Sequence, residues 1–274
     1  MADESLIINP HSSASDTRDY IRVYGGNNYF LILDSGKLYG LGRNEYGQIG
    51  RKSVPYIFKP KLITTCVTAA AAGWHFSGYV TSDGKVNIVH AGDITVVTEV
   101  ENITRIFAIS NTFFAVDRED KVFRIEVNEN FFSYPGKIKF NVTLMPDSMK
   151  DELSINQYHM CRPLDLGLDN ADLSDYKKAV KGKLHSLAVA LKYDGKVDFI
   201  EPFFGKLGCT FEFENIADVA VSQSEDFLFS TKSNELLYVN TGFSVPLKSV
   251  RESRYKDAMR EKKLVAHVRK IVLP

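Results

Sequence analysis

The 274-residue sequence predicts an all-β fold, a β-propeller of about six to seven blades with a basic C-terminal helix. Short apolar strands, polar turns and alternating strands recur along the chain as hairpins, at spacings of 36 to 48 residues. A single hairpin cannot bury an apolar face by itself, so this spacing favours small antiparallel sheets packed around a centre. A β-sandwich or a solenoid could use the same hairpins, although the spacing is long for a sandwich.

Five clear hairpins are expected, and each turns at residues that tolerate a positive φ. Glycine closes three turns, at Gly36, Gly84 and Gly195, while Asp120 and Asn234 are the next most tolerant choices. The hairpins span residues 29–41, 78–89, 113–125, 187–200 and 226–239. Two runs of small residues, 67–73 and 216–222, precede hairpins and are expected to be inner strands near the axis.

The interval between the third and fourth hairpin turns is 75 residues, about twice its neighbours. A sixth, degenerate copy is expected there, with residues 139–145 and 151–158 as its strands. Residues 159–178 lack sustained alternation and are interpreted as an inserted loop. The chain then divides into an N-terminal extension at 1–20, propeller repeats at 21–246 and a C-terminal segment at 247–274.

Basic charge is concentrated in the C-terminal segment, where residues 247–270 hold nine basic and three acidic side chains. Residues 248–267 contain no proline or glycine, which favours a helix with Ser249 as its N-cap. This helix could lie solvated across the propeller or dock on nucleic acid or an acidic partner. Residues 268–274 are expected to return as a strand that closes the ring against residues 21–26. The candidate partner contacts of the predicted basic helix are Arg251, Arg254, Arg260, Lys262 and Lys263.

Composition excludes several classes of protein. Thirty-four basic and 34 acidic residues balance, so the whole chain lacks the single-sign field of a dedicated DNA-coating domain. Three widely spaced cysteines with no CxxC pair fit a reducing compartment better than a disulfide framework. The N-terminus has no signal-peptide core, and no run of eighteen apolar residues occurs. We therefore expect an intracellular protein, cytoplasmic or nuclear, with no membrane partner.

No pattern of catalytic or metal-binding residues stands out. His90, His159 and His267 fall in unrelated contexts without metal-ligand spacing, and no phosphate-binding loop or nucleophile elbow occurs. The thiols Cys66, Cys161 and Cys209 carry no local signature of a nucleophile and are interpreted as buried or incidental. The sequence therefore predicts no enzyme, no cofactor and no metal.

Two stretches resemble the repeats of the regulator of chromosome condensation family, which run G-x-x-H-S-x-A-L and then D-G-x-V-Y-x-W-G-x-N-x-x-G-Q-L-G. Residues 182–189 resemble the first half, and residues 34–50 resemble the second half, with Leu41 where tryptophan is usual. The resemblance implies a β-propeller fold in which the glycines serve a crossing between blades. The histidine position of the repeat corresponds here to Asn28, His75, Asn111, His185 and Glu225. A side chain that recurs at one place is expected to hold neighbouring blades together.

Members of the resembled family include a nucleotide exchange factor for a Ran-type small GTPase and many proteins that only bind other proteins. The leading prediction here is a non-catalytic protein–protein interaction propeller, a scaffold or a subunit of a larger assembly. The alternatives are an exchange factor for a Ran-type GTPase and a nucleic-acid-associated scaffold that uses the basic tail. Aromatic candidates for partner contact are Trp74, Phe131, Phe132, Phe203 and Phe204.

Overall fold

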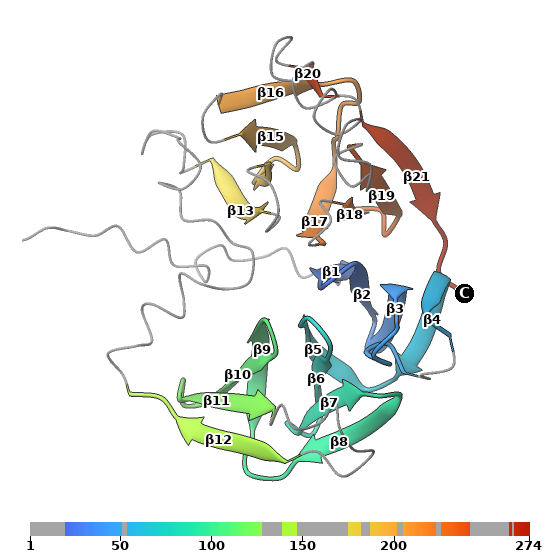
Figure 1. The fold of residues 1–274 in the computed structure, drawn as a ribbon. Helices are drawn as coiled ribbons and strands as arrows, with labels where there is room; N and C mark the ends of the chain where they lie inside the picture. Colours follow the sequence, from blue (N-terminus) through green and yellow to red (C-terminus); the bar gives the residue numbers. More distant parts are fainter. Residues whose placement is uncertain are drawn as a thin grey trace, which may run out of the picture.

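The computed structural model describes residues 20–50, 54–127, 139–146, 175–181, 187–201, 205–222, 226–241, 263–264 and 266–274. Within this part of the chain all regular secondary structure is β-strand, so the all-β prediction is confirmed. Five sheets stand around a common centre, as the blades of a β-propeller do (Figure 1). In each sheet the first strand lies nearest the centre and later strands lie farther out (Figure 1).

The first three sheets each contain four consecutive antiparallel strands. Sheet 1 contains β1 (Arg22–Gly25), β2 (Tyr29–Asp34), β3 (Lys37–Arg43) and β4 (Tyr56–Thr64). Sheet 2 contains β5 (Val67–Ala72), β6 (Ser77–Thr81), β7 (Val86–His90) and β8 (Asp93–Val97). Sheet 3 contains β9 (Ile103–Ile109), β10 (Thr112–Asp117), β11 (Val122–Val127) and β12 (Phe140–Leu144).

The last two sheets take their outermost strands from the C-terminal segment. Sheet 4 contains β13 (Tyr176–Lys181), β14 (Ala188–Lys192), β15 (Val197–Glu201), β16 (Gly205–Cys209) and β20 (Lys263–Leu264), which pairs parallel to β16. Sheet 5 contains β17 (Ile216–Val221), β18 (Asp226–Thr231), β19 (Leu236–Asn240) and β21 (His267–Ile271). The small-residue strands β5 and β17 lie next to the centre, as expected (Figure 1).

All five predicted hairpins form, with their turns at the expected residues. Gly36, Gly84, Gly195, Asp120 and Asn234 all have positive φ values, between 58° and 89°. Asp34 faces Lys37 across the first hairpin, so Ser35 and Gly36 are the two central residues of its turn. Ser35 also has a positive φ, of 48°, and a two-residue hairpin turn with both values positive matches the right-handed twist of its strands.

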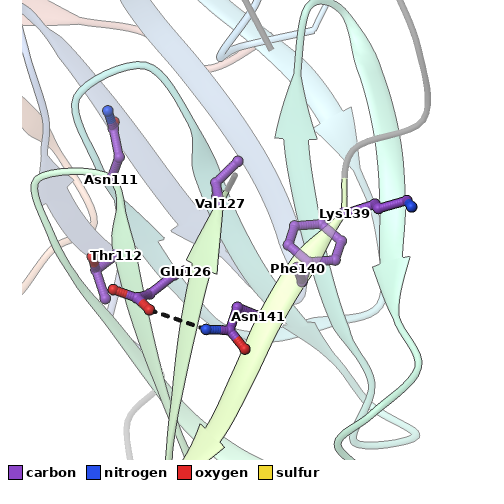
Figure 2. Close-up of a pocket in the computed structure, with 7 residues that line it drawn as sticks. All are labelled: Asn111, Thr112, Glu126, Val127, Lys139, Phe140 and Asn141. Carbon is purple, nitrogen blue, oxygen red and sulfur yellow. Dashed lines mark hydrogen bonds between the residues drawn. The ribbon is translucent and has the colours of Figure 1, made fainter. Parts of the chain in front are cut away.

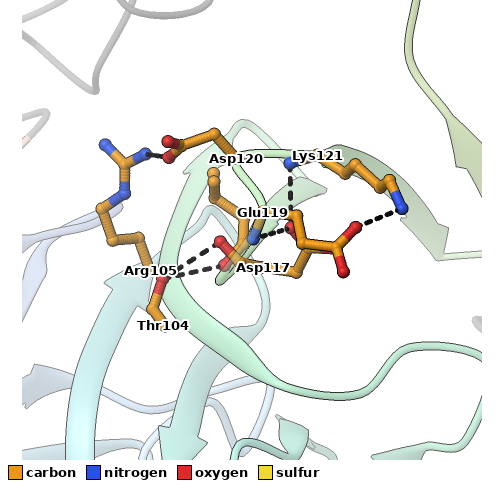
Figure 3. A network of polar contacts seen from close by, with 7 residues as sticks. Thr104, Arg105, Asp117, Glu119, Asp120 and Lys121 are labelled. Carbon is orange, nitrogen blue, oxygen red and sulfur yellow. Dashed lines mark hydrogen bonds and ion pairs between the residues drawn. The ribbon is translucent and has the colours of Figure 1, made fainter.

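The third hairpin turn is organised by Asp117 (Figure 3). One carboxylate oxygen of this residue accepts the backbone N–H groups of Glu119 at 2.8 Å and Lys121 at 2.9 Å. Arg105 on the neighbouring strand pairs with Asp120 at 2.8 Å. This polar network takes the place of the conformational freedom that glycine provides in three of the other turns, and it explains why Asp120 can stand at a positive φ.

Apolar clusters fill the junctions between neighbouring sheets. The junction of sheets 1 and 2 contains Tyr29, Leu31 and Ile49 from sheet 1 with Ala70 and Val89 from sheet 2. Comparable clusters join sheet 2 to sheet 3 and sheet 4 to sheet 5. Burial of these faces requires two sheets at a time, so no sheet is a stable unit alone.

Sheets 5 and 1 also pack together, so the first described strand lies against the last sheet. The backbone N–H of Val23 on β1 donates to a carboxylate oxygen of Asp218 on β17 at 3.0 Å. The N–H of Ile21 donates to Asn234 Oδ1 at 3.2 Å, and Ile21, Leu228 and Ile271 share one apolar cluster. These contacts join the first inner strand to the last sheet.

Four sequence-based expectations need correction. Residues 139–145 do not begin a sixth hairpin, because β12 pairs with β11 as the outer strand of sheet 3; residues 151–158 lie outside the described residues. The inserted loop ends before residue 178, because β13 begins at Tyr176. The returning strand forms as β21, but it pairs with β19 rather than with residues 21–26. The predicted C-terminal helix, 248–267, lies mostly outside the described residues, and its described positions 263–264 and 267 belong to the strands β20 and β21.

Candidate functional site

Among the described residues, Trp74 is the predicted contact residue that lies in a connection, at one end of the ring. Because antiparallel strands alternate in direction, the connections after the first and third strands of every sheet emerge at the same end. We call this end the loop face. Trp74 lies in the connection β5–β6. Outside the described residues, Phe131 and Phe132 fall between β11 and β12, Phe203 and Phe204 between β15 and β16, and Arg251, Arg254, Arg260 and Lys262 between β19 and β20. Lys263 begins β20.

Trp74 is half-buried on the loop face where sheets 2 and 3 meet. Its backbone N–H donates to the carbonyl oxygen of Ser110 at 2.8 Å, so a connection of sheet 3 fixes its position. Its ring lies edge-on to the His75 ring at 6.4 Å. The backbone of Trp74 is therefore held in place while its side chain stays partly exposed, as in an interaction anchor.

His75 connects three sheets, which supports its interpretation as a residue that holds neighbouring blades together. Its ring lies 4.0 Å from that of Tyr46, in the connection β3–β4 of sheet 1. Its backbone N–H donates to Asn111 Oδ1 at 3.1 Å, and Asn111 Nδ2 lies 3.3 Å from His75 Nδ1. Asn111 belongs to sheet 3 and occupies the same repeat position as His75. Of the other residues at this position, His185 and Glu225 lie outside the described residues.

The glycine-rich stretch makes the crossing between blades that the resemblance implies. Gly47 accepts a hydrogen bond from the N–H of Gly92, in the connection β7–β8 of sheet 2, at 3.2 Å. Within the stretch, Asn44 is fully buried and its side chain accepts the N–H of Ile49 at 2.8 Å. The amide group of Asn44 donates to the carbonyl oxygen of Gly50 at 3.1 Å. The side chain of Asn44 therefore stabilises the connection between β3 and β4.

A cavity of about 510 Å³ opens beside the loop-face end of sheet 3 (Figure 2). Its lining is mixed, with one aromatic ring, one cation, one carboxylate and several amide or hydroxyl groups. The lining residues are Asn111, Thr112, Glu126, Val127, Lys139, Phe140 and Asn141. Asn141 Nδ2 donates to the Glu126 carboxylate at 3.4 Å (Figure 2). Asn111 also bonds to His75, so one lining residue of the cavity belongs to the histidine junction as well.

A second cavity, of about 300 Å³, lies between the outer strands of sheets 2 and 3. It shares Lys139 and Phe140 with the first cavity and adds Thr95, Val96 and Glu99. Behind it, the buried His90 places Nε2 at 2.8 Å from Thr95 Oγ1. Burial lowers the pKa of His90, partly opposed by the Asp93 carboxylate, so its imidazole is neutral at pH 7.

Sequence reasoning did not find the two cavities. Their residues come from four separate stretches that share no motif, and Phe140 was assigned to a sixth hairpin. The one available signal was Asn111, which occupies the recurring polar position of the repeat. Convergence of the other residues depends on how sheets 2 and 3 pack.

The remaining histidines and cysteines are distributed without forming a reactive cluster. No group of three or more metal-ligating side chains comes together in the described part of the chain. Cys66 is exposed, while burial raises the pKa of the Cys209 thiol and so disfavours its thiolate. His267 is exposed on β21, whereas Cys161 and His159 lie outside the described residues.

No helix within the described ranges is long and apolar enough to cross a bilayer. No curated protein is a sequence match to this chain.

Among solved structures, human WBSCR16 is similar with a TM-score of 0.36 at 15% identity, over 91% of this chain and 66% of that one. Prp20p from Saccharomyces cerevisiae has a TM-score of 0.37 at 12% identity, over 81% of this chain and 58% of that one. Yeast RCC1 (Prp20) bound to Kap60 has a TM-score of 0.36 at 11% identity, over 81% and 56%. The chain thus spans less than two thirds of these proteins, and at such TM-scores they add no argument about fold or function.

The model of the regulator of chromosome condensation (RCC1) repeat matches residues 35–80. The match begins in the first hairpin turn, includes the glycine-rich crossing and His75, and ends in β6. Residues 35–80 therefore match a repeat of the regulator of chromosome condensation family, within a ring of five described β-sheets.

Proposed function

We propose that this chain is a non-catalytic protein-interaction propeller that binds a partner protein through its loop face. One observation carries the proposal: contacts link Trp74 through His75 to Asn111, which lines the first cavity, and that cavity shares Lys139 and Phe140 with the second. The surface offers an aromatic edge, amides and charges of both signs, which are the groups that protein interfaces use. A role as a scaffold or subunit inside the cell follows from this proposal.

We also propose that the complete ring has six to seven blades. Each of two buried apolar faces forms a cluster within one sheet: Phe114 and Val122 in sheet 3, and Tyr176 and Ala190 in sheet 4. In the chain, these two sheets stand on either side of residues 145–175. Both apolar faces are buried, but neither packs against a described sheet. Their burial therefore supports at least one further blade between sheets 3 and 4.

The test is retention of partners from a cell extract by the immobilised full chain. Lys139→Glu reverses the charge of Lys139, which lines both cavities. Trp74→Ser removes the aromatic ring of Trp74. Lys196→Glu is the matched control, because Lys196 is exposed in a hairpin turn at the opposite end of the ring. We expect a specific set of proteins to bind wild type and Lys196→Glu but not the two loop-face variants. Equal retention by all four proteins would refute the proposal.

An exchange factor for a Ran-type GTPase is the second candidate, favoured by the repeat match at residues 35–80. Nucleotide release from a Ran-type GTPase, measured with and without the chain, separates the two functions. Unchanged release is expected for an interaction propeller. Acceleration of release would replace the non-catalytic proposal.

A further inference from the structure

The outer strand of sheet 1 displays a pair of aromatic rings that the loop-face proposal does not use. β4 pairs only with β3 among the described strands. On it, Tyr56 is 42% exposed and Phe58 is 75% exposed, and their rings stack with centroids 5.4 Å apart. Two stacked rings at a sheet edge form a contiguous apolar surface, unlike the isolated apolar residues that are common on any protein. We call Tyr56 and Phe58 the aromatic patch.

The aromatic patch lies on the side of sheet 1 that faces sheet 5, because Ile57, between its two residues, belongs to the apolar cluster shared with sheet 2 on the other side. In Figure 1, β21 and β4 follow one another along the rim. Burial and the carboxylate of Asp226 raise the pKa of Tyr56, and Asp226 also contributes to the raised pKa of Tyr238 on β19. Both tyrosine hydroxyls are therefore within electrostatic reach of one carboxylate. Tyr238 stands directly opposite Arg269 on β21, so both point to the same side of sheet 5.

Charge around the aromatic patch is unbalanced in favour of cations. The nearby acids already have partners: Glu45 pairs with Arg43, and Asp226 accepts a hydrogen bond from Asn240 at 2.7 Å. Lys59 and Arg269 are exposed, and neither has an ion pair or hydrogen bond within the described ranges. A ligand that brings carboxylates to this surface would therefore meet cations that are available to pair with it.

The middle of β4 disfavours a second copy of the chain as the occupant. Pro60 has no N–H to donate to an added strand, and it stands between Lys59 and Lys61. In an antiparallel pairing of two β4 edges centred there, the lysines of the two copies would face each other and repel. Side-chain docking of an acidic segment avoids both problems.

We propose that the aromatic patch binds an extended acidic segment of a partner protein. An apolar side chain of that segment packs on the rings of Tyr56 and Phe58, and its carboxylates pair with Lys59 and Arg269. This second surface lies at the junction of sheets 5 and 1, apart from the cavities at sheet 3. The proposal does not depend on the function proposed for the loop face.

The probe is a short fluorescent peptide of alternating glutamate and leucine, compared with a matched peptide of alternating lysine and leucine. Binding to the full chain is measured by fluorescence anisotropy. We expect the acidic peptide alone to bind, with an affinity that falls as salt is added. Phe58→Ser should weaken binding about tenfold or more, as loss of an aromatic anchor does, and the double variant Lys59→Glu with Arg269→Glu should do the same.

The matched control is Leu144→Ser, because Leu144 is 56% exposed on β12, the outer strand of another sheet. This variant should bind the acidic peptide like the wild type, and all variants should keep the wild-type melting temperature. The proposal is overturned if neither peptide binds, if both bind equally, or if Phe58→Ser leaves the affinity unchanged. Self-association of the wild type that Phe58→Ser abolishes, seen by sedimentation, would assign the patch to a second copy instead.

Discussion

At the scale of the residue, Gly47 shows how one glycine controls contact between two sheets. Its φ is +68°, and a Cβ added there would lie 2.2 Å from the backbone nitrogen of Gly92 and 2.5 Å from the carbonyl carbon of Ala91. Both atoms belong to backbone, which cannot move aside as a flexible side chain can. The close approach therefore requires glycine for its lack of a side chain as well as for its positive φ.

Gly47→Ala is expected to destabilise the protein by about 3 kcal/mol or more, because strain at positive φ adds to the clash with sheet 2. Gly50→Ala is the matched control. Gly50 has φ +75°, but nothing lies within 4 Å of an added Cβ, so only the strain of about 1 kcal/mol remains. Urea unfolding of both variants measures the difference. Equal losses in the free energy of unfolding would show that the close approach of Gly47 to Gly92 does not contribute to stability.

At the scale of the element, each hairpin depends on its own turn chemistry. The third hairpin uses Asp117, whose carboxylate accepts two backbone N–H groups (Figure 3). Asp117→Ala should lower the free energy of unfolding by about 1 kcal/mol, since two turn donors lose their acceptor at a partly exposed site. Thermal unfolding followed by circular dichroism measures this loss.

The control for that turn is Glu119→Ala. Glu119 pairs with Lys121 at 2.6 Å, but both side chains are more than half exposed. Exposed pairs are screened by water and salt, so this variant should change stability by about 0.5 kcal/mol or less. A loss as large as that of Asp117→Ala would mean that the ion pair organises the turn.

At the scale of the whole molecule, Asp218 joins three sheets. It lies on β17 of sheet 5, accepts the N–H of Val23 on sheet 1, and pairs with Lys178 on sheet 4 at 2.7 Å. The two side chains of the ion pair are 19% and 27% exposed, so the pair is partly shielded from solvent. The bond from Val23 also fixes the first inner strand against the last sheet.

Asp218→Ala should destabilise the protein by about 2 kcal/mol, because it leaves a backbone N–H and a partly buried ammonium without their acceptor. Asp218→Asn keeps an acceptor for Val23 and should lose less. Glu235→Ala, which removes an exposed pair with Lys270 in the same sheet, should stay within about 0.5 kcal/mol. Urea unfolding compares the three variants. An unchanged Asp218→Ala would show that closure of the ring rests on the apolar contacts alone.

The sequence by itself determined the five hairpins, their turn residues and the small inner strands. These features depend on local backbone conformation, which the residue types of each turn specify. The positive φ values of Gly36, Gly84 and Asn234 are examples. The glycine-rich crossing could be read from a motif for the same reason. Trp74 was selected as a candidate because it stands beside the recurring polar position, and its role in partner contact stays a prediction.

Only the tertiary structure decided which strand completes each sheet and where surfaces converge. Residues 140–144 have the same alternation whether they begin a new hairpin or complete sheet 3, and β21 could pair with any open edge. The cavity around Lys139 and the aromatic patch beside β21 depend on such pairings. Alternation specifies which side of a strand is buried but not which distant strand it meets, because that choice depends on packing between whole sheets.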